Sequence, residues 1–354
     1  MKARAPMPYG AAMTSQPHVV PPPSGGRRLR WHDLPGPQRA AVEERLGGVV
    51  VQEHSATTGF SPGLASVLVT AEGTRAFVKA ARETDEAESA RLHRTEARVT
   101  AALDPGLPVP RLLWTHDDGD WVVVAYEAVD GHTPTTPWDP AELTTVLGTV
   151  AQLGAVDATS LGLPDAATDV GALFTGWENL RDDPDPSLAD VAPWAVDRLD
   201  ELAGLAGRAA AACAGDALVH GDLRADNLLV TDDGVVVVDW PWAMRGAAFF
   251  DLIAFLPSVG MQGVRGRTEP LTGPADLEHR RAVGAELDAL FRSSPSAAGV
   301  DDAQVLPVVA GITAYFLDSG RRPPVPSIPR LRAFQRAQGA AGAAWLEVLL
   351  DDAR

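Results

Sequence analysis

The segment from His220 to Asp239 constrains the fold of this chain more than any other part of its 354 residues. It begins with His220-Gly-Asp-Leu-Arg-Ala-Asp-Asn227 and ends with Asp239, which follows a run of valines. Between them, Asp232-Asp-Gly234 separates two apolar stretches, which is a signal for a tight β-hairpin. The pattern predicts a polar loop, then a hairpin, then a strand that leaves an apolar interior and stops at a carboxylate.

Three side chains of this segment have the chemistry of a phosphoryl-transfer site. Asn227 and Asp239 offer hard oxygen atoms, which suit Mg²⁺ when phosphate and water fill its other positions. Asp222 is then free to accept a proton from an attacking hydroxyl group. The alternative is a surface hairpin with chance polar residues, since Asp and Asn favour turns for local reasons. That alternative explains Asp232 and Asp233, but it does not explain the other three together.

The pattern His-x-Asp-x-x-x-x-Asn, followed by an aspartate at the end of a strand, resembles the catalytic set of kinases. Gly221 stands in the second position, and Asp239-Trp-Pro replaces Asp-Phe-Gly. With these features the chain looks like the aminoglycoside phosphotransferase and choline kinase-like family. The resemblance runs from about Trp31 to the C-terminus and is strongest between Leu218 and Leu252.

The resemblance implies ATP and Mg²⁺ as cofactors and a role for each position of the segment. Asp222 would be the catalytic base, and Arg224 would contact the γ-phosphate. Asn227 and Asp239 would be the Mg²⁺ ligands. Structural roles, in holding and bracing the loop, would fall to His220 and Asp251.

Kinases of this kind also need a lysine on the third strand of an N-terminal sheet and a glutamate on the next helix. Phe77-Val-Lys79-Ala80 supplies a lysine flanked by apolar residues on the third predicted strand. We expect Glu96 to be its partner, because the family places this glutamate shortly before the Leu and Pro pairs seen here as Leu103 and Pro108–Pro110. The competing glutamates, any of which could be ordinary solvated helix charge, are Glu83, Glu86 and Glu88, with Glu88 as second choice.

A turn-rich loop, Thr57–Gly63, is predicted to approach the phosphates of the nucleotide. Its Gly59 and Gly63 would let backbone N–H groups come close to phosphate oxygens, and Ser61 could add a hydroxyl contact. Gly-x-x-x-Gly is a common spacing, so this loop is a weak signal by itself.

A second segment, Tyr126-Glu-Ala-Val-Asp-Gly131, looks like the hinge between the two lobes of a kinase. Backbone groups of Glu127 and Ala128 would bind the adenine there. An ordinary strand end followed by a turn is the alternative for the same residues.

The predicted fold class is α+β, with the two-lobed protein-kinase-like fold: a five-stranded N-terminal lobe with one helix and a mostly helical C-terminal lobe. Residues 1–30 are predicted to be a disordered tail, because they are basic, lack acids and contain three consecutive prolines. Residues 31–127 would form the nucleotide-binding lobe and residues 128–354 the catalytic and substrate lobe.

The strands are predicted from β-branched runs and tight turns, and the helices from Ala-, Leu- and Glu-rich stretches. The predicted strands of the N-terminal lobe are Val49–Gln52, Leu64–Thr70, Arg75–Ala80, Arg111–Thr115 and Trp121–Tyr126. The predicted helices are Glu83–Leu103, Pro140–Ala158, Val170–Leu180, Leu188–Ala214, Gly246–Leu256, Ala275–Arg292, Asp302–Asp318 and Ile328–Asp351.

The composition excludes several classes of partner. Asp and Glu number 47 against 30 Lys and Arg, and this net charge of −17 opposes nucleic-acid binding through phosphate contacts. No uncharged apolar run reaches the roughly 18 residues of a membrane span. The single cysteine, Cys213, permits no intrachain disulfide, which suits the cytoplasm. The sequence gives no sign of an obligate protein partner.

The predicted function is therefore transfer of the γ-phosphate of ATP to a hydroxyl of a small molecule, such as an aminoglycoside-like compound, an amino alcohol or a sugar. A nucleotide-binding pseudokinase or regulatory module is the alternative. Acids for a cationic acceptor could come from a set of six, but none has a spacing that distinguishes a pocket from a solvated surface, which is the favoured interpretation: Asp182, Asp183, Asp185, Glu347, Asp351 and Asp352. The tryptophans of the helical lobe could form an aromatic wall of the acceptor site or could pack in the core: Trp138, Trp177, Trp194, Trp240, Trp242 and Trp345.

Overall fold

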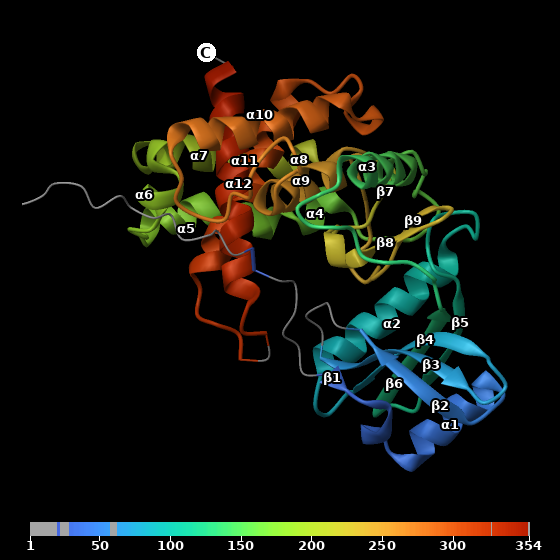
Figure 1. Cartoon of the computed structure of the whole chain (residues 1–354). Helices are drawn as coiled ribbons and strands as arrows, with labels where there is room; N and C mark the ends of the chain where they lie inside the picture. Colours follow the sequence, from blue (N-terminus) through green and yellow to red (C-terminus); the bar gives the residue numbers. More distant parts are fainter. Residues whose placement is uncertain (1–19, 22–27, 57–61, 327, 353–354) are drawn as a thin grey trace, which may run out of the picture.

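The computed structural model describes residues 20–21, 28–56, 62–326 and 328–352. These residues form two lobes, the N-terminal one built around a β-sheet and the C-terminal one mostly helical (Figure 1). The predicted α+β class is confirmed. Among the described helices, none has both the length and the apolar character that crossing a membrane requires.

The sheet of the N-terminal lobe is antiparallel except where its short first strand joins it. The order is β1-β3-β4-β6-β5, and β2 also pairs with β3. The strands are β1 (Arg28–Leu29), β2 (Val50–Ser55), β3 (Gly63–Thr70), β4 (Arg75–Arg82), β5 (Leu112–Asp117) and β6 (Trp121–Glu127). The five strands predicted from sequence are all present, with ends that differ by a few residues.

Helices cover both faces of this sheet, so its central strands are apolar on both sides. On β6, Val123 and Ala125 pack with α1 (Gly36–Leu46) and the short η1 (Trp31–Asp33). The alternate residues of β6, Val122 and Val124, pack with α2 (Ala87–Ala102) on the other face. Burial on both faces explains why β6 is a continuous apolar run.

The first strand differs from expectation. Arg28 and Leu29 fall in the segment predicted to be a disordered tail, yet they pair in parallel with Gly63 and Leu64 of β3. Backbone pairing with β3 needs no particular side chain, which is why the basic composition of this segment did not predict it. Residues 1–19 and 22–27 of the predicted tail lie outside the described residues.

The core of the C-terminal lobe is formed by its long helices. These are α3 (Pro140–Gly154), α9 (Phe250–Gln262), α10 (Leu277–Ser293), α11 (Asp302–Arg321) and α12 (Leu331–Asp352). Side chains of Asp139, Asp276 and Asp301 cap the N-termini of α3, α10 and α11 by accepting backbone N–H groups. Shorter elements complete the lobe: α4 (Ala166–Asp169), η2 (Gly171–Phe174), α5 (Gly176–Asp182), α6 (Leu188–Val191), η3 (Pro193–Arg198), α7 (Leu199–Ala206), α8 (Ala209–Ala212) and η5 (Pro295–Ala297).

Three of the predicted helices in this lobe were wrong in extent. The single helix expected over Leu188–Ala214 is broken into α6, η3, α7 and α8, because Pro193 has no N–H to donate and restricts Ala192 before it. The helix expected over Val170–Leu180 is divided between η2 and α5. The helix expected from Gly246 starts at Phe250, because β10 (Met244–Gly246) pairs with β7 (Ala217–Val219).

The β elements of the C-terminal lobe hold the polar loop that the sequence singled out. The predicted hairpin is confirmed as β8 (Leu228–Thr231) and β9 (Gly234–Val237), with Gly234 at φ 135° in the turn. The loop leaves β7, passes through η4 (Ala225–Asn227) and enters the hairpin directly. This arrangement presents the loop toward the sheet lobe (Figure 1).

Candidate active site

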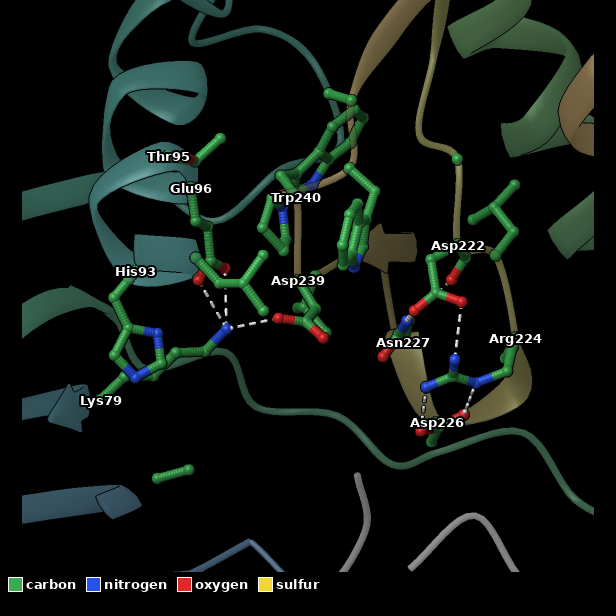
Figure 2. Close-up of a pocket in the computed structure, with 18 of the residues that line it drawn as sticks. Lys79, His93, Thr95, Glu96, Asp222, Arg224, Asp226, Asn227, Asp239 and Trp240 are labelled. Carbon is green, nitrogen blue, oxygen red and sulfur yellow. Dashed lines mark hydrogen bonds and ion pairs between the residues drawn. The ribbon is translucent and has the colours of Figure 1, made fainter. Parts of the chain in front are cut away.

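A cleft of about 1120 Å³ lies between the lobes and holds most of the predicted site residues. Its sheet side is lined by β3, β4 and α2, and its helical side by the loop after β7 and the residues that follow β9. Figure 2 shows the polar side chains of both sides facing one another.

Lys79 lies between two carboxylates at the back of this cleft. Its Nζ donates to Glu96 Oε1 and Oε2 at 2.8 and 2.7 Å, and to Asp239 Oδ1 at 2.8 Å (Figure 2). Burial alone would lower the pKa of Lys79, but Asp239 and Glu96 raise it above its ordinary value. Burial alone would raise the pKa of Asp239, yet the Lys79 ammonium lowers it to about 2. Lys79 and Asp239 are therefore ionised at neutral pH.

The structure brings Lys79 together with the glutamate expected from sequence. The competing glutamates have other partners: Glu83 pairs with Arg94, and Glu88, which also lines the cleft, pairs with Arg91. Glu96 is 3 % exposed because its position on α2 faces the sheet. Glu86, the residue immediately before α2, is in no salt bridge among the described residues.

The loop after β7 is fixed by a buried carboxylate from α9. Asp251 Oδ2 accepts the N–H of His220 at 2.6 Å, and its Oδ1 accepts the N–H of Gly221 at 2.9 Å. Gly221 has φ 81°, and a Cβ at this position would lie 2.5 Å from the carbonyl oxygen of Trp242. Only glycine fits there without strain. The bracing role predicted for Asp251 matches these two hydrogen bonds.

The imidazole of His220 joins the loop to the end of the hairpin. Its Nε2 lies 3.0 Å from the carbonyl oxygen of Val238, and its Nδ1 lies 3.2 Å from the N–H of Asp222. A carbonyl needs a donor and an N–H needs an acceptor, so the neutral Nε2–H tautomer satisfies both. Burial lowers the pKa of His220 to about 4, which keeps this tautomer at neutral pH.

Asp222 stands at the centre of the loop beside an arginine. Arg224 Nη1 donates to Asp222 Oδ1 at 2.6 Å, and its Nε and Nη2 both donate to Asp226 at 3.0 Å. The Asp222 side chain keeps 29 % of its surface exposed. Its enclosed position raises the pKa of Asp222 to about 7, and the charge of Arg224 opposes part of that rise. A carboxyl with such a pKa is suited to accept a proton near neutral pH.

Sequence reasoning missed Asp226, which is buried and holds two of the Arg224 nitrogens. The arrangement changes how the predicted γ-phosphate contact of Arg224 is to be understood. In this structure the guanidinium holds carboxylates on both sides, so a phosphate contact would require it to turn away from one of them. An Arg-x-Asp spacing inside the loop was the available signal.

Asn227 and Asp239 have the donor atoms that a hard cation requires. Asn227 Nδ2 donates to the backbone carbonyl of Asp222 at 2.8 Å, which leaves Oδ1 as its potential metal ligand. Asp239 uses Oδ1 for Lys79, so Oδ2 is the oxygen that can take a cation. Asp239 adopts φ 70°, a left-handed backbone conformation that aspartate tolerates better than most residues. Two protein oxygens plus substrate phosphates fit the coordination habit of Mg²⁺.

Two basic side chains of the sheet lobe were not predicted from sequence. His93, three residues before Glu96 on α2, is 5 % exposed and lines the cleft (Figure 2). Its buried Nε2 has no hydrogen-bond partner among the described residues, and burial lowers the pKa of His93 to about 3. Arg28 of β1 also lines the cleft, close enough to Asp239 and Asp226 to interact with their charges. In its Nε2–H tautomer this imidazole has an unused donor beside cationic groups, which suits an anionic ligand such as a nucleotide phosphate.

The structure describes part of the predicted phosphate loop, Thr57–Gly63, and all of the predicted hinge, Tyr126–Gly131. Gly59 and Ser61 lie outside the described residues. Gly63 starts β3 at φ 108°, where a Cβ would lie 2.5 Å from the carbonyl oxygen of Ala80. Glu127 lines the cleft, but its N–H already donates to Arg111. The backbone groups still predicted to bind adenine are therefore the carbonyl of Glu127 and the N–H and carbonyl of Ala128.

The acids considered for a cationic acceptor do not line the cleft. Asp183 pairs with Arg321, and Glu347 pairs with Arg280 inside the helical lobe. Among the described residues that line the cleft, none comes from the set Asp182, Asp183, Asp185, Glu347, Asp351 and Asp352. Of the tryptophans, four are fully buried as core packing would have it, namely Trp138, Trp177, Trp240 and Trp345. Trp242 differs, because it lines the cleft and is 46 % exposed.

Comparison with known proteins agrees with this geometry. A family model described as the phosphotransferase enzyme family matches residues 57–288, which is more than half of the chain. No curated protein matches the chain. Solved structures of similar fold include an aminoglycoside phosphotransferase from Alicyclobacillus acidocaldarius, 16 % identical, covering 86 % of this chain and 92 % of that one at TM-score 0.53.

Two further structures contain ligands. Amicoumacin kinase hAmiN, in complex with AMP-PNP, Ca²⁺ and Ami, is 13 % identical, with 85 % of this chain and 93 % of that one covered at TM-score 0.52. A thermostable mutant of aminoglycoside phosphotransferase APH(4)-Ia, in a ternary complex with ADP and hygromycin B, is 14 % identical, with coverages of 87 % and 97 % at TM-score 0.52. At such identities the likeness concerns the fold, and it confirms the predicted kinase-like architecture.

A sheet lobe with a buried lysine–glutamate pair, facing an Asp–Asn loop and a strand-terminal aspartate, defines a kinase-type phosphotransferase. The chain belongs to the phosphotransferase enzyme family. Family membership supports the activity class and leaves the acceptor to be found from the cleft itself.

Proposed function

We propose that this chain is an ATP- and Mg²⁺-dependent kinase that moves the γ-phosphate of ATP to a hydroxyl group of a small molecule. One observation carries the proposal: Asp222, Asn227 and Asp239 line the same cleft as the Lys79–Glu96 ion pair. The nucleotides bound by two similar structures, AMP-PNP in one and ADP in the other, support it by analogy of fold. The proposal includes a cytoplasmic location, where ATP is supplied, and no partner other than small molecules.

The residues around Lys79 bind the nucleotide in this proposal. Lys79 holds the α- and β-phosphates, and Glu96 fixes the direction in which its ammonium points. The backbone of Glu127 and Ala128 receives the adenine. Gly63 lets β3 begin next to Ala80, whose carbonyl oxygen a Cβ would approach to 2.5 Å, and its neighbours Pro62 and Leu64 line the cleft in which the phosphates would lie.

Asn227 and Asp239 are the proposed Mg²⁺ ligands, through Oδ1 and Oδ2 respectively. When bound there, Mg²⁺ supplies charge neutralisation at the phosphate oxygens. Without a cation, Asp239 is already held ionised by Lys79, so no proton has to leave before a cation enters. The hydrogen bond from Asn227 Nδ2 to the Asp222 carbonyl keeps the amide oxygen directed away from the loop.

Asp222 acts on the acceptor. It accepts the proton of the acceptor hydroxyl while that oxygen forms its bond to the γ-phosphorus. The bond from the γ-phosphorus to the bridging β-phosphate oxygen breaks, and ADP leaves with the electron pair. The products are a phosphate monoester and ADP, and the proton passes from Asp222 to solvent. Arg224 positions Asp222 through the 2.6 Å hydrogen bond from Nη1.

The proposal is tested by measuring ADP release from Mg²⁺-ATP against aminoglycosides, amino alcohols, sugars and neutral aromatic alcohols. Asp222→Ala is the test variant, and Asp233→Ala, at an exposed turn of the neighbouring hairpin, is its matched control. Release that depends on an acceptor, survives Asp233→Ala and disappears in Asp222→Ala supports the kinase. If the nucleotide binds tightly but no compound of the acceptor panel stimulates ADP release, the result would instead support a regulatory nucleotide-binding protein.

A further inference from the structure

Large apolar side chains are exposed at the mouth of the cleft, beyond Asp222. The exposed large apolar residues among those described are Val49, Val51, Leu173, Val196, Trp242 and Leu277. Leu173 of η2, at 45 % exposure, and Trp242, at 46 %, both line the cleft. Exposed apolar surface that gathers at a cleft marks a place where a ligand covers it.

The wall behind these two residues is apolar as well. It is formed by side chains of α11 and α12 that line the cleft, namely Ile312, Phe316, Leu331 and Phe334. Phe334 lies with its ring 6.0 Å from the guanidinium carbon of Arg224, which places this wall next to the loop that carries Asp222. A hydroxyl group presented to Asp222 would therefore belong to a molecule that contacts this wall.

The cleft-lining polar groups of this wall near Asp222 are neutral, and the charged residue beside them, Arg332 of α12, is a cation that donates to Gln335 Oε1 at 2.9 Å. Tyr315 is close enough to Asp222 to respond to its charge, and its hydroxyl is hydrogen-bonded to Gln335. Gln335 and Gln338 line the same stretch of the cleft and are buried. Hydroxyl and amide groups can hydrogen-bond hydroxyls, carbonyls or ethers of a ligand, and they offer an ammonium group no charge.

Most carboxylates of this part of the cleft are neutralised by arginines. Arg224 holds Asp222 and Asp226, and Arg91 holds Glu88 while its guanidinium carbon lies 5.8 Å from the Trp242 ring. Among the described lining residues of this part, the carboxylates outside any ion pair are Asp169 and Glu86. A molecule with several ammonium groups would lose their hydration on binding here, and there are too few unpaired carboxylates to compensate for that loss.

We propose that the acceptor is a neutral hydroxyl compound with a ring or another large apolar surface, and not a polycation. This inference rests on the proposed function, because it names the acceptor that Asp222 would deprotonate. The apolar part of the molecule lies against Trp242, Leu173 and the α11–α12 wall, while its hydroxyl group lies at Asp222. Its remaining polar atoms meet Tyr315, Gln335 and Gln338.

The test measures binding with the full chain saturated with Mg²⁺-AMP-PNP, by calorimetry at about 0.15 M salt to screen long-range charge. The probes are 2-phenylethanol, 2-naphthylethanol and the polycation kanamycin A. The larger neutral alcohol should bind about tenfold more tightly than the smaller one, since the second ring adds apolar surface for burial. Kanamycin A should bind more weakly than either alcohol.

Two cleft variants and one matched control locate the binding. Trp242→Ala and Leu173→Asp should each weaken 2-naphthylethanol about tenfold. Leu277→Asp places the same new charge at a residue that is 44 % exposed on α10, outside the cleft, and should leave the affinity unchanged. Exposed positions are chosen so that each variant keeps its fold, which the thermal midpoint checks.

The outcomes separate this inference from the proposed function. Failure of Mg²⁺-AMP-PNP itself to bind would contradict the proposed function. If the nucleotide binds, the acceptor inference alone is overturned by any of three results: kanamycin A binding more tightly than the alcohols, no gain from the second ring, or cleft variants that behave like Leu277→Asp. Nucleotide binding together with the graded series and cleft-specific losses supports both.

Discussion

Replacing Glu96 with glutamine tests how the cleft holds its lysine. Lys79 Nζ has both Glu96 oxygens at 2.8 and 2.7 Å and Asp239 Oδ1 at 2.8 Å. Glutamine keeps one acceptor oxygen but puts an NH₂ group where the second oxygen stood, facing another donor. The charge of Lys79 would then be balanced by Asp239 alone.

The expected loss of stability follows from burial of the pair. The side chains of Lys79 and Glu96 are 11 % and 4 % exposed, so water cannot replace the lost contact. Removing the only partner of a buried charge costs about 3–5 kcal/mol. Because Asp239 remains, the loss should be closer to that of one charge-assisted hydrogen bond, about 2 kcal/mol. That corresponds to a fall in the thermal midpoint of about 3 °C for a chain of this size.

Glu88→Gln is the matched control, because Glu88 lies on the same helix and, like Glu96, pairs with a cation, here Arg91. Its side chain is 65 % exposed, so its ion pair with Arg91 should be worth at most about 0.5 kcal/mol. Thermal and urea unfolding of wild type, Glu96→Gln and Glu88→Gln measure the difference. Binding of a fluorescent ATP analogue should weaken about tenfold in Glu96→Gln alone, since Lys79 loses its orientation.

Equal unfolding midpoints for Glu96→Gln and Glu88→Gln would refute this reasoning about stability. Unchanged nucleotide affinity in a Glu96→Gln protein of lowered stability would mean that the pair holds the lobe together without orienting Lys79 for phosphate.

Three further predictions concern the loop after β7. The kcat/KM for the acceptor should fall as the pH drops through about 7, because burial raises the pKa of Asp222 to about 7 and a protonated Asp222 cannot accept a proton. A kcat/KM that does not change between pH 5 and 8 would contradict this. Gly221→Ala should cost about 2 kcal/mol in urea unfolding, since φ 81° and the nearby Trp242 carbonyl oppose a Cβ. Asp251→Asn should cost about 2 kcal/mol by leaving the His220 or Gly221 N–H unsatisfied, and an unchanged midpoint would exclude that bracing role.

The predicted site residues that the structure brings to one cleft are tied to one short segment, to one strand or to one helix. Asp222, Asn227 and Asp239 lie on a loop and hairpin whose turn residues and valine run define the local backbone. Lys79 and Glu96 were predicted from the resemblance to kinases, which implies a lysine on the third strand and a glutamate shortly before the Leu and Pro pairs. The local pattern gave the strand and the helix, and the resemblance gave the pairing between them.

The residues that the sequence did not predict depend on contacts between distant segments. Arg28 reaches the cleft only because β1 pairs with β3, and nothing in its basic surroundings indicates that pairing. In the sequence nothing distinguishes His93 from other residues of its helix, and only the fold buries it close to Lys79. The acceptor wall combines η2, α11, α12 and the residues after β9, and no spacing in the sequence links them.

The helices of the C-terminal lobe show the same division. α10, α11 and α12 were predicted nearly in full, because their Ala- and Leu-rich stretches are long, local signals. The single helix expected over Leu188–Ala214 is wrong, because Pro193 interrupts the helix in spite of the alanine-rich composition around it. The start of α9 moved because β10 pairs with β7, a contact that composition cannot indicate.

The central claim, that Asn227 and Asp239 hold a cation on the nucleotide facing Asp222, is tested most directly by Mg²⁺-linked nucleotide binding. The dissociation constant of AMP-PNP is measured with and without Mg²⁺ for wild type, Asp239→Asn and the exposed-turn control Asp233→Asn. The account predicts that Mg²⁺ tightens binding at least tenfold in wild type and Asp233→Asn, and that this gain disappears in Asp239→Asn. The same gain from Mg²⁺ in all three proteins would contradict it.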